Sequence, residues 1–221
     1  MYSRLTIHTI FMYYPLMKLN LKRIFNFISE TGSLMFMKRT HYRSLINTFD
    51  TVSSHSHHVA IIAYCLTRME GLSHEDGLKA IAMGTFHDSA ESRVGDLDFI
   101  AKHYDTRDEE KAFIDQFEGL PFEKDLDNLI KEYEQRETLV AKCAKDADNL
   151  EQIYQEWVLT YTGNQLAKRW FEGSTKYRIP FLRTKSAKKL FKFFKNHQPH
   201  DWWFEDLVEK GVKQEFLTGK K

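Results

Sequence analysis

Apolar residues recur at three- and four-residue intervals through most of this 221-residue chain, which is the spacing of one face of an α-helix. Runs of Ala, Leu, Lys and Glu are common, whereas alternating Val, Ile and Thr are few, and this argues against a sandwich or barrel. Pro121, Pro180 and Pro199 fall between the periodic segments. The sequence therefore predicts an all-α fold. Helices are expected at about 18–36, 54–70, 75–92, 107–118, 122–136, 137–161, 164–172, 184–196 and 202–214.

The chain reads as a single domain. No stretch rich in Pro, Gly or Ser divides it, and its length is enough to bury one sizeable core. Because Met17 begins a sequence that suits a first helix, residues 1–16 are expected to be an N-terminal extension, disordered or a start-site artefact, and residues 17–215 one compact domain. The apolar run at 10–14 is too short to span a bilayer and lacks a small-residue cleavage site, which argues against a membrane anchor or a secretory signal.

The formal net charge of +1 gives the chain no global attraction to nucleic acid or membrane. Cys65 and Cys143 are interpreted as buried helix residues and not as a disulfide, which favours the reducing cytoplasm. Charge is nevertheless uneven, since residues 104–137 carry twelve acids against five bases and residues 165–198 ten bases against one acid. We expect solvated helix faces that complement each other within the fold or across a homodimer. A nucleic-acid-binding stripe is disfavoured because the aromatic residues at 184–196 fit the buried side of a helix.

The helix expected at 54–70 places a histidine at the N-terminal end of its core-facing stripe. The stripe recurs at steps of four, three, four and three and consists of His55, Val59, Ile62, Leu66 and Met69. His57 and His58 turn away from it and are expected at the surface. The next helix is expected to bury Leu78, Ile81 and Ala82. A lone histidine at such a position is more often a hydrogen-bonded core residue than a ligand, so His55 needs partners to indicate a site.

The dipeptide His87-Asp88 stands near the end of the helix expected at 75–92. Adjacent residues are about 100° apart around a helix, so both can turn toward one metal ion only where the helix ends. Glu91 lies over the same turn, where a carboxylate can reach a water molecule held by a metal ion, as a general base must. Gly95 suits a helix stop and Asp96 follows on the loop. Alone, Glu91 could be an exposed helix-end acid and Asp96 a cap; beside His87-Asp88 they indicate a site.

Two aspartates compete for one further position. In the segment 145–150, Asp146 and Asp148 are two residues apart, so a helix points them in nearly opposite directions. An apolar stripe that includes Cys143 and Leu150 lies nearer Asp146, whereas Asp148 lies on a side with small alanines. Periodicity thus favours Asp146 as the more buried residue and does not choose a ligand.

Four motifs follow one another along the chain. They are Val52-Ser53-Ser54-His55-Ser56, Phe86-His87-Asp88-Ser89-Ala90-Glu91, Gly95-Asp96-Leu97 and Lys145-Asp146-Ala147-Asp148-Asn149-Leu150. Their order and spacing resemble the motifs of the HD-domain phosphohydrolases, in particular the bacterial and archaeal 5'-deoxynucleotidases and their uncharacterised HD relatives. The resemblance runs from about Gly32 to Asp148, and more weakly to Trp203. It implies a single compact all-helical HD-domain fold.

The same resemblance implies the roles of individual residues. The ligands of a divalent metal would be His55, His87, Asp88 and Asp148, with Asp148 preferred to Asp146 because the family's ligand precedes a pair like Asn149-Leu150. The family's catalytic acids match Glu91 and Asp96. Glu91 would orient or deprotonate the attacking water, and Asp96 would protonate or position the leaving 5'-oxygen.

The family's phosphate-contacting arginine matches Arg39, within Phe36-Met37-Lys38-Arg39-Thr40. Since that match needs a one-residue gap, Arg43 is a second candidate. The deoxynucleotidases carry a tryptophan beside this arginine, associated with preference for 2'-deoxyribose. The position is Thr40 in this chain, so weaker deoxy selectivity is expected.

The expected function is a metal-dependent phosphoric monoester hydrolase of the cytoplasm, a 5'-nucleotidase that releases phosphate from (deoxy)nucleoside 5'-monophosphates. Mixed nitrogen and oxygen ligands suit Co, Mn, Zn, Ni or Fe, with Mg also considered. A small-molecule nucleotide is the expected partner, with no membrane. One alternative is a phosphodiesterase or nucleoside triphosphohydrolase that uses the same site. Another is a non-catalytic nucleotide-binding regulatory module, with the basic C-terminal region as its interaction surface.

Overall fold

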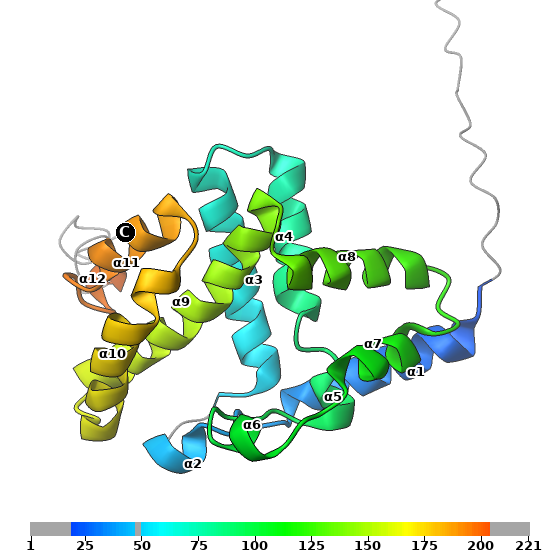
Figure 1. Cartoon of the computed structure of the whole chain (residues 1–221), viewed down its shortest axis with the longest axis horizontal. Coiled ribbons are helices and arrows are strands. Elements are labelled where there is room, and N and C mark those ends of the chain that lie inside the picture. Colours follow the sequence, from blue (N-terminus) through cyan, green and yellow to red (C-terminus); the bar gives the residue numbers. More distant parts are fainter. Residues whose placement is uncertain (1–18, 47–49, 204–221) are drawn as a thin grey trace, which may run out of the picture.

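The computed structural model describes residues 19–46 and 50–203, and over these ranges the chain is helical (Figure 1). The expectation of an all-α fold is confirmed: these ranges contain no strand, and one isolated antiparallel bridge joins Lys38 and Thr51. The elements are α1 Leu21–Gly32, η1 Ser33–Met35, α2 Tyr42–Leu45, α3 Val52–Met69, α4 His74–Phe86, α5 Glu91–Val94, α6 Ala101–Tyr104, α7 Glu109–Phe117, α8 Glu123–Gln135, α9 Leu139–Tyr161, α10 Gln165–Tyr177, η2 Ile179–Phe181, α11 Lys185–Phe194 and α12 Asp201–Trp203.

The main core forms where α3, α4 and α9 pack together (Figure 1). These three helices supply most of its buried residues, among them Val59, Leu66, Met83, Leu150 and Ile153. Leu182, Ala187 and Phe191 close it from the side of α11. Burying so many apolar side chains is the main favourable term for this fold, since a fully buried Leu, Ile or Phe contributes about 1.5–3 kcal/mol.

A second core lies on the other side of α4. Phe27 of α1 is its centre, with ring centroids 6.3 Å from Phe86, 6.2 Å from Phe117 and 6.4 Å from Phe122. Phe86 is the last residue of α4, so the turn that follows it lies where the two cores meet. The fold thereby fixes the residues after Phe86 from both sides.

The helix expected at 75–92 ends instead at Phe86, and a new short helix begins at Glu91. Residues 87–90 form turns, in which Ser89 N–H donates to Phe86 O and Glu91 N–H to Asp88 O, both at 3.0 Å. His87 Nδ1 lies 2.9 Å from the Gly84 carbonyl, and this bond occupies an acceptor that a continuing helix would use for its backbone.

Three expectations about burial are wrong. Met69 is 46% exposed and Leu78 50% exposed, because α3 and α4 face each other through smaller residues such as Ala63, Gly77 and Ala80. Cys65 is exposed, whereas Cys143 is buried as expected.

Other expectations fall partly outside the described residues. Residues 1–16, and the part of the expected helix 202–214 beyond Trp203, lie outside them. The helix expected at 164–172 continues to Tyr177. Within the described ranges, no helix is long and apolar enough to cross a membrane.

Candidate metal centre

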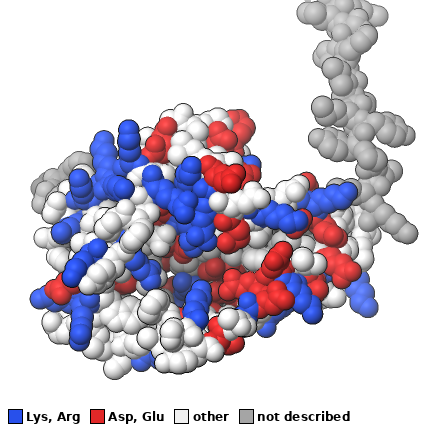
Figure 2. Space-filling model, viewed as in Figure 1, with Lys and Arg blue, Asp and Glu red and all other residues white. Residues whose placement is uncertain are grey.

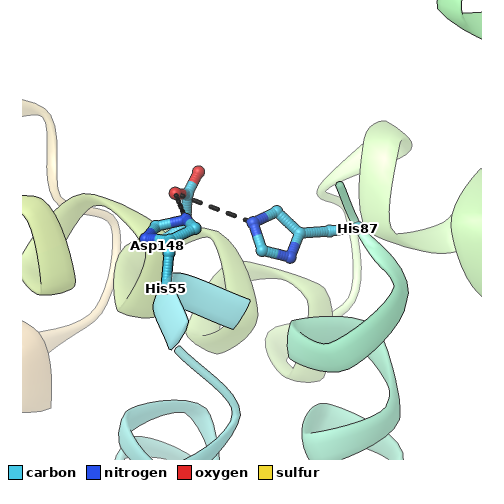
Figure 3. A group of neighbouring side chains, drawn as sticks. All are labelled: His55, His87 and Asp148. Carbon is cyan, nitrogen blue, oxygen red and sulfur yellow. Dashed lines mark ion pairs between the residues drawn. The ribbon is translucent and has the colours of Figure 1, made fainter. Parts of the chain in front are cut away.

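Three elements bring His55, His87 and Asp148 together (Figure 3). His55 lies in the first turn of α3, His87 directly follows α4, and Asp148 lies in the middle of α9. Asp148 Oδ1 is 3.3 Å from His55 Nε2 and 3.8 Å from His87 Nε2. One potential ligand atom from each residue lies within 4.8 Å of the others, a spacing at which all three can bind one ion.

Asp88, the second half of the dipeptide, lies beside the same atoms. Its Oδ2 is 3.3 Å from His87 Nε2 and 3.5 Å from His55 Nε2. Adjacent residues can both face the centre because residues 87–90 form turns and not a helix. The structure thus brings together all four residues that the sequence motifs indicate as ligands.

The start of α3 is fixed by its cap, which in turn fixes His55. Thr51 Oγ1 accepts from Ser54 N–H at 3.2 Å, and Ser54 Oγ accepts from Thr51 N–H at 2.8 Å, the reciprocal bonds of a capping box. Just upstream, Val52 N–H donates to Met37 O at 2.9 Å. This bond ties the segment that carries Arg39 to the start of the same helix.

Both histidines are oriented by a bond at Nδ1. His55 Nδ1 lies 2.6 Å from Glu151 Oε2, and His87 Nδ1 lies 2.9 Å from the Gly84 carbonyl. Their Nε2 atoms are buried, have no hydrogen-bond partner, and lie near the same carboxylates. Imidazole nitrogens held in this way fit a transition-metal ion or zinc, as do the carboxylate oxygens between them.

The charges at this centre favour a cation. Burial by itself disfavours an imidazolium, but the carboxylates of Asp148 and Glu151 raise the pKa of His55 to about 9. The carboxylates of Asp88 and Asp148 likewise raise the pKa of His87 to about 10, against the effect of burial. Burial works against both aspartates as anions, yet His87 lowers the pKa of Asp88, and Lys145 that of Asp148. A divalent ion fits a negative potential of this kind.

Arg39 lies against the edge of the cluster formed by the carboxylates. One guanidinium nitrogen, Nη1, is 3.2 Å from Asp88 Oδ2, 3.5 Å from Asp96 Oδ1 and 3.9 Å from Glu91 Oε2. Despite burial, these three acids raise its pKa further, so Arg39 is a permanent cation. Arg43, the other candidate, pairs with Asp98 at 2.7 Å and its side chain is 61% exposed. Of the two arginines, Arg39 is the one beside the predicted ligands.

The two predicted catalytic acids have different surroundings. Burial and the neighbouring charges of Asp88 and Asp96 raise the pKa of Glu91 to about 9, and Glu91 Oε2 is buried without a hydrogen-bond partner. Asp96 Oδ2 accepts from Thr40 N–H and, at 2.9 Å, from Thr40 Oγ1–H. Glu91 is therefore suited to carry a proton, whereas Asp96 is held by donors.

The turn between α4 and α5 is anchored from behind by a buried glutamine. Gln116 of α7 accepts from Ser89 Oγ–H at 2.8 Å and donates to Ser89 O at 3.0 Å. Its amide also donates to Glu30 of α1 at 3.0 Å. These bonds fix the turn on which Asp88 and Glu91 stand.

Sequence reasoning missed two residues of α9 that contact the cluster. Glu151 is 1% exposed, and its other carboxylate oxygen is 3.4 Å from His58 Nδ1, so His58 is not the simple surface residue expected. Lys145 Nζ lies 2.6 Å from Asp148 Oδ2, and that charge raises the pKa of the lysine. Both could have been found from their spacing, since each is three residues from Asp148 and on a helix such neighbours share a face.

Asp146 has a different role from Asp148. It is 1% exposed, as the apolar stripe predicts, and it accepts from Thr184 N–H at 2.7 Å and from Thr184 Oγ1–H at 2.8 Å. Arg183 N–H also donates to it. Asp146 thus fixes the start of α11, on the side of α9 away from His55.

The surface view shows one face of the molecule hollowed near its middle (Figure 2). Asp and Glu side chains gather over α5 and α7 on one side of the hollow, and Lys and Arg side chains over α11 on the other (Figure 2). In α11, Phe191 is buried as its pattern predicts, although Phe193 is 61% exposed. The acidic and basic segments of the sequence thus form separate acidic and basic areas on this face of the molecule.

Comparison with known proteins identifies the family. A sequence model of the HD domain matches residues 31–189, more than half of the chain. The chain is 32% identical over 154 residues to 5'-deoxynucleotidase HDDC2 of Dictyostelium discoideum, covering 65% of this chain and 80% of that protein. It is 32% identical over 139 residues to the mouse 5'-deoxynucleotidase HDDC2, covering 60% and 67%.

Solved structures share the fold. The structural-genomics protein APC5600 superposes with a TM-score of 0.65 at 26% identity, covering 82% of this chain and 99% of its own. A protein from Magnetospirillum magnetotacticum described as a predicted metal-dependent phosphohydrolase gives a TM-score of 0.54 at 21% identity, covering 89% and 94%. The range matched by the HD domain contains every residue of the cluster. The chain belongs to the HD domain phosphohydrolases.

Proposed function

We propose that this protein is a metal-dependent phosphomonoesterase that releases phosphate from nucleoside 5'-monophosphates. The observation that carries the proposal is the convergence of His55, His87, Asp88 and Asp148 next to Arg39 and Glu91. Ligands, a phosphate-binding cation and a proton carrier are the parts that such a hydrolysis needs. The similarity to proteins named 5'-deoxynucleotidase supports a mononucleotide as the substrate.

The metal would be held by the Nε2 atoms of the two histidines and by carboxylate oxygens of the two aspartates. When bound, a divalent ion supplies a Lewis acid that polarises a phosphoryl oxygen and lowers the pKa of water. Glu151 and the Gly84 carbonyl accept from the Nδ1–H groups of the two imidazoles. These bonds leave each Nε2 unprotonated and directed at the centre, as a metal ligand must be. The donor set of two nitrogens and carboxylate oxygens suits Mn, Fe, Co, Ni or Zn better than Mg.

The remaining residues handle charge and protons. Arg39 binds the phosphoryl oxygens and offsets the negative charge that they carry in the transition state. In its ionised form Glu91 would accept a proton from the attacking water; the charge of a bound divalent ion would favour that form, which burial, Asp88 and Asp96 oppose. Asp96 holds Arg39 and Thr40 in place. The family resemblance also implies that Asp96 would position or protonate the leaving 5'-oxygen.

The test is phosphate release from a panel of nucleoside monophosphates by the full chain, after removal of metal and reconstitution with each of several divalent ions. Release should depend on the added metal and be lost in His87→Ala and Asp148→Ala, which should also lose bound metal by elemental analysis. Asp146→Asn is the matched control, since it changes a buried aspartate of the same helix and should keep the metal. Cleavage confined to cyclic nucleotides or triphosphates would contradict the proposal, as would bound metal without turnover of any phosphate ester.

A further inference from the structure

Among the described residues of the metal centre, the two aspartates are more exposed to solvent than the two histidines. The side chains of His55 and His87 are 1% and 2% exposed, so the centre is closed behind them. Those of Asp88 and Asp148 are 20% and 19% exposed. These two carboxylates therefore line the open side, and a substrate has to arrive next to them.

A different cation is paired with each of these carboxylates. Arg39, from the segment before α3, lies 3.2 Å from Asp88 Oδ2, and Lys145, from α9, lies 2.6 Å from Asp148 Oδ2. The other oxygen of Asp148, Oδ1, is the one nearest His55 Nε2, at 3.3 Å. Lys145 can thus bind Asp148 and leave Oδ1 directed at the metal centre.

Beside a bound divalent ion, Arg39 would offer the phosphate a positive charge that three carboxylates already share. A phosphate monoester brings as many as two negative charges to a centre that already holds several carboxylates. The guanidinium of Arg39 is shared among Asp88, Glu91 and Asp96, at 3.2, 3.9 and 3.5 Å. A second cation at the other carboxylate would offset the charge of the phosphoryl oxygens directly.

Lys145 has N–H donors to spare, and its side chain is exposed enough to contact a phosphate group. An ammonium group carries three N–H donors, and its bond to Asp148 uses one of them. The ring of Tyr133 lies 5.7 Å from Nζ on one side, and the side chain is 26% exposed. The lysine is therefore held in place at the open side of the centre while still able to reach a ligand.

We propose that Lys145 is a second phosphate-contacting residue, which donates to a non-bridging oxygen of the substrate's phosphoryl group. Arg39 and Lys145 then hold that group from the Asp88 side and the Asp148 side. Two fixed cations would orient the phosphoryl group for in-line attack by water, and this orientation would lower the barrier of the chemical step. The inference rests on the proposed function, and it gives a role to Lys145, a residue of the fourth motif to which no role was assigned from the sequence.

The test is calorimetric titration of inorganic phosphate into the metal-loaded full chain, so that it needs no turnover. Lys145→Gln keeps an N–H group for Asp148 but has no charge, and Lys145→Arg keeps the charge. Lys142→Gln, one turn earlier on α9, is the matched control. Lys145→Gln should retain its metal and bind phosphate about tenfold to a hundredfold more weakly, the range for a hydrogen bond to a charged group. Lys145→Arg should recover most of the affinity, and Lys142→Gln should match wild type.

Unchanged phosphate affinity in metal-loaded Lys145→Gln would overturn the inference and leave the proposed function intact. Loss of metal in that variant would also overturn it, because Lys145 would then serve only to hold Asp148. If the metal-loaded wild type neither binds phosphate nor releases it from any monoester, the proposed function itself fails.

A measurement on the wild type covers the case in which Lys145→Gln does not fold. Bound phosphate should slow the reductive methylation of Lys145 and leave that of Lys142 unchanged, as followed by mass spectrometry of the metal-loaded chain. Equal rates for Lys145 with and without phosphate would overturn the inference.

Discussion

The two histidines of the candidate metal centre, His55 and His87, are oriented by acceptors of different strength. His87 Nδ1 bonds to a neutral backbone carbonyl, whereas His55 Nδ1 bonds to the buried carboxylate of Glu151 at 2.6 Å. A carboxylate behind an imidazole fixes its tautomer and increases its electron donation to a metal. Glu151 would therefore strengthen metal binding by His55 without itself being a ligand.

We expect Glu151→Ala to weaken metal binding by roughly 10- to 100-fold, the usual effect of removing such a partner. Glu151→Gln should lose less, because an amide oxygen can still accept from Nδ1–H. Competition with a chelator measures the affinity. Gln155→Ala is the control, since Gln155 contacts Glu151 at 3.0 Å on its other oxygen and not His55. Equal metal affinity in Glu151→Ala and wild type would show that His55 needs no such support.

We expect Glu91 to serve proton transfer and not metal binding. Its Oε2 is 3.9 Å from Arg39, whereas the carboxylates paired with the Nε2 atoms of the two histidines are those of Asp88 and Asp148. Glu91→Gln should therefore keep the metal and the substrate affinity while kcat falls by roughly 10² or more. Metal analysis and steady-state kinetics check this together. Loss of metal in Glu91→Gln would instead make Glu91 a ligand.

By the family resemblance, Thr40 takes the place of a tryptophan of the bacterial and archaeal deoxynucleotidases, and its side chain is bonded to Asp96 at 2.9 Å. A short side chain held in this way offers little bulk against a 2'-hydroxyl. We expect a preference of less than about tenfold between deoxy- and ribonucleoside monophosphates, which corresponds to under about 1.4 kcal/mol. The ratio of kcat/KM for matched pairs of substrates measures it. A ratio well above a hundred would mean that another residue recognises the sugar.

At the scale of the elements, apolar periodicity located the long helices but predicted the wrong face of α4 for its contact with α3. It gave α9 nearly to the residue, and it identified Asp146 as the more buried aspartate. It chose the wrong face of α4, because that helix meets α3 through glycine and alanine, which carry little apolar signal. The end of α4 at Phe86 was also missed, since it depends on a bond from the His87 side chain to Gly84. Glu151 and Lys145 were missed as well, although their spacing of three residues from Asp148 places them on the same face of α9.

Substitution by alanine should have opposite effects on stability at two helical glycines: one lies in the close contact of α3 and α4, and the other lies in α10. A Cβ on Gly84 would lie 2.7 Å from Ala60 Cα, a backbone atom that cannot move aside cheaply. Gly84→Ala should therefore destabilise the protein by about 1–3 kcal/mol, the usual cost of overpacking. A Cβ on Gly173 in α10 would meet no atom within 4 Å outside its own stretch of helix, so Gly173→Ala should stabilise by up to about 1 kcal/mol through helix propensity. Urea unfolding of both variants measures the change in unfolding free energy. A stabilised Gly84→Ala would mean that α3 and α4 can move apart to admit the methyl group.

At the scale of the whole molecule, the centre joins parts that otherwise belong to different packing units. His55 and Asp148 extend from the core of α3, α4 and α9, whereas His87 and Asp88 follow Phe86, which packs in the second core around Phe27 (Figure 1). A metal bound by all four residues therefore crosslinks segments that are far apart in sequence. It also offsets the repulsion among the carboxylates that approach one another there.

This crosslink should make stability depend on metal. A ligand that binds only the folded chain adds about 2.7 kcal/mol at a free concentration one hundred times its Kd, which for a chain of this size is about 5 °C or more in Tm. We expect chelation to lower the Tm of the wild type and added metal to restore it. Asp148→Ala should lose this response. Asp146→Ala should start from a lower Tm, because the start of α11 loses its acceptor, yet keep the increment on metal addition. If Asp146→Ala lost the response and Asp148→Ala kept it, the ligand on α9 would be Asp146.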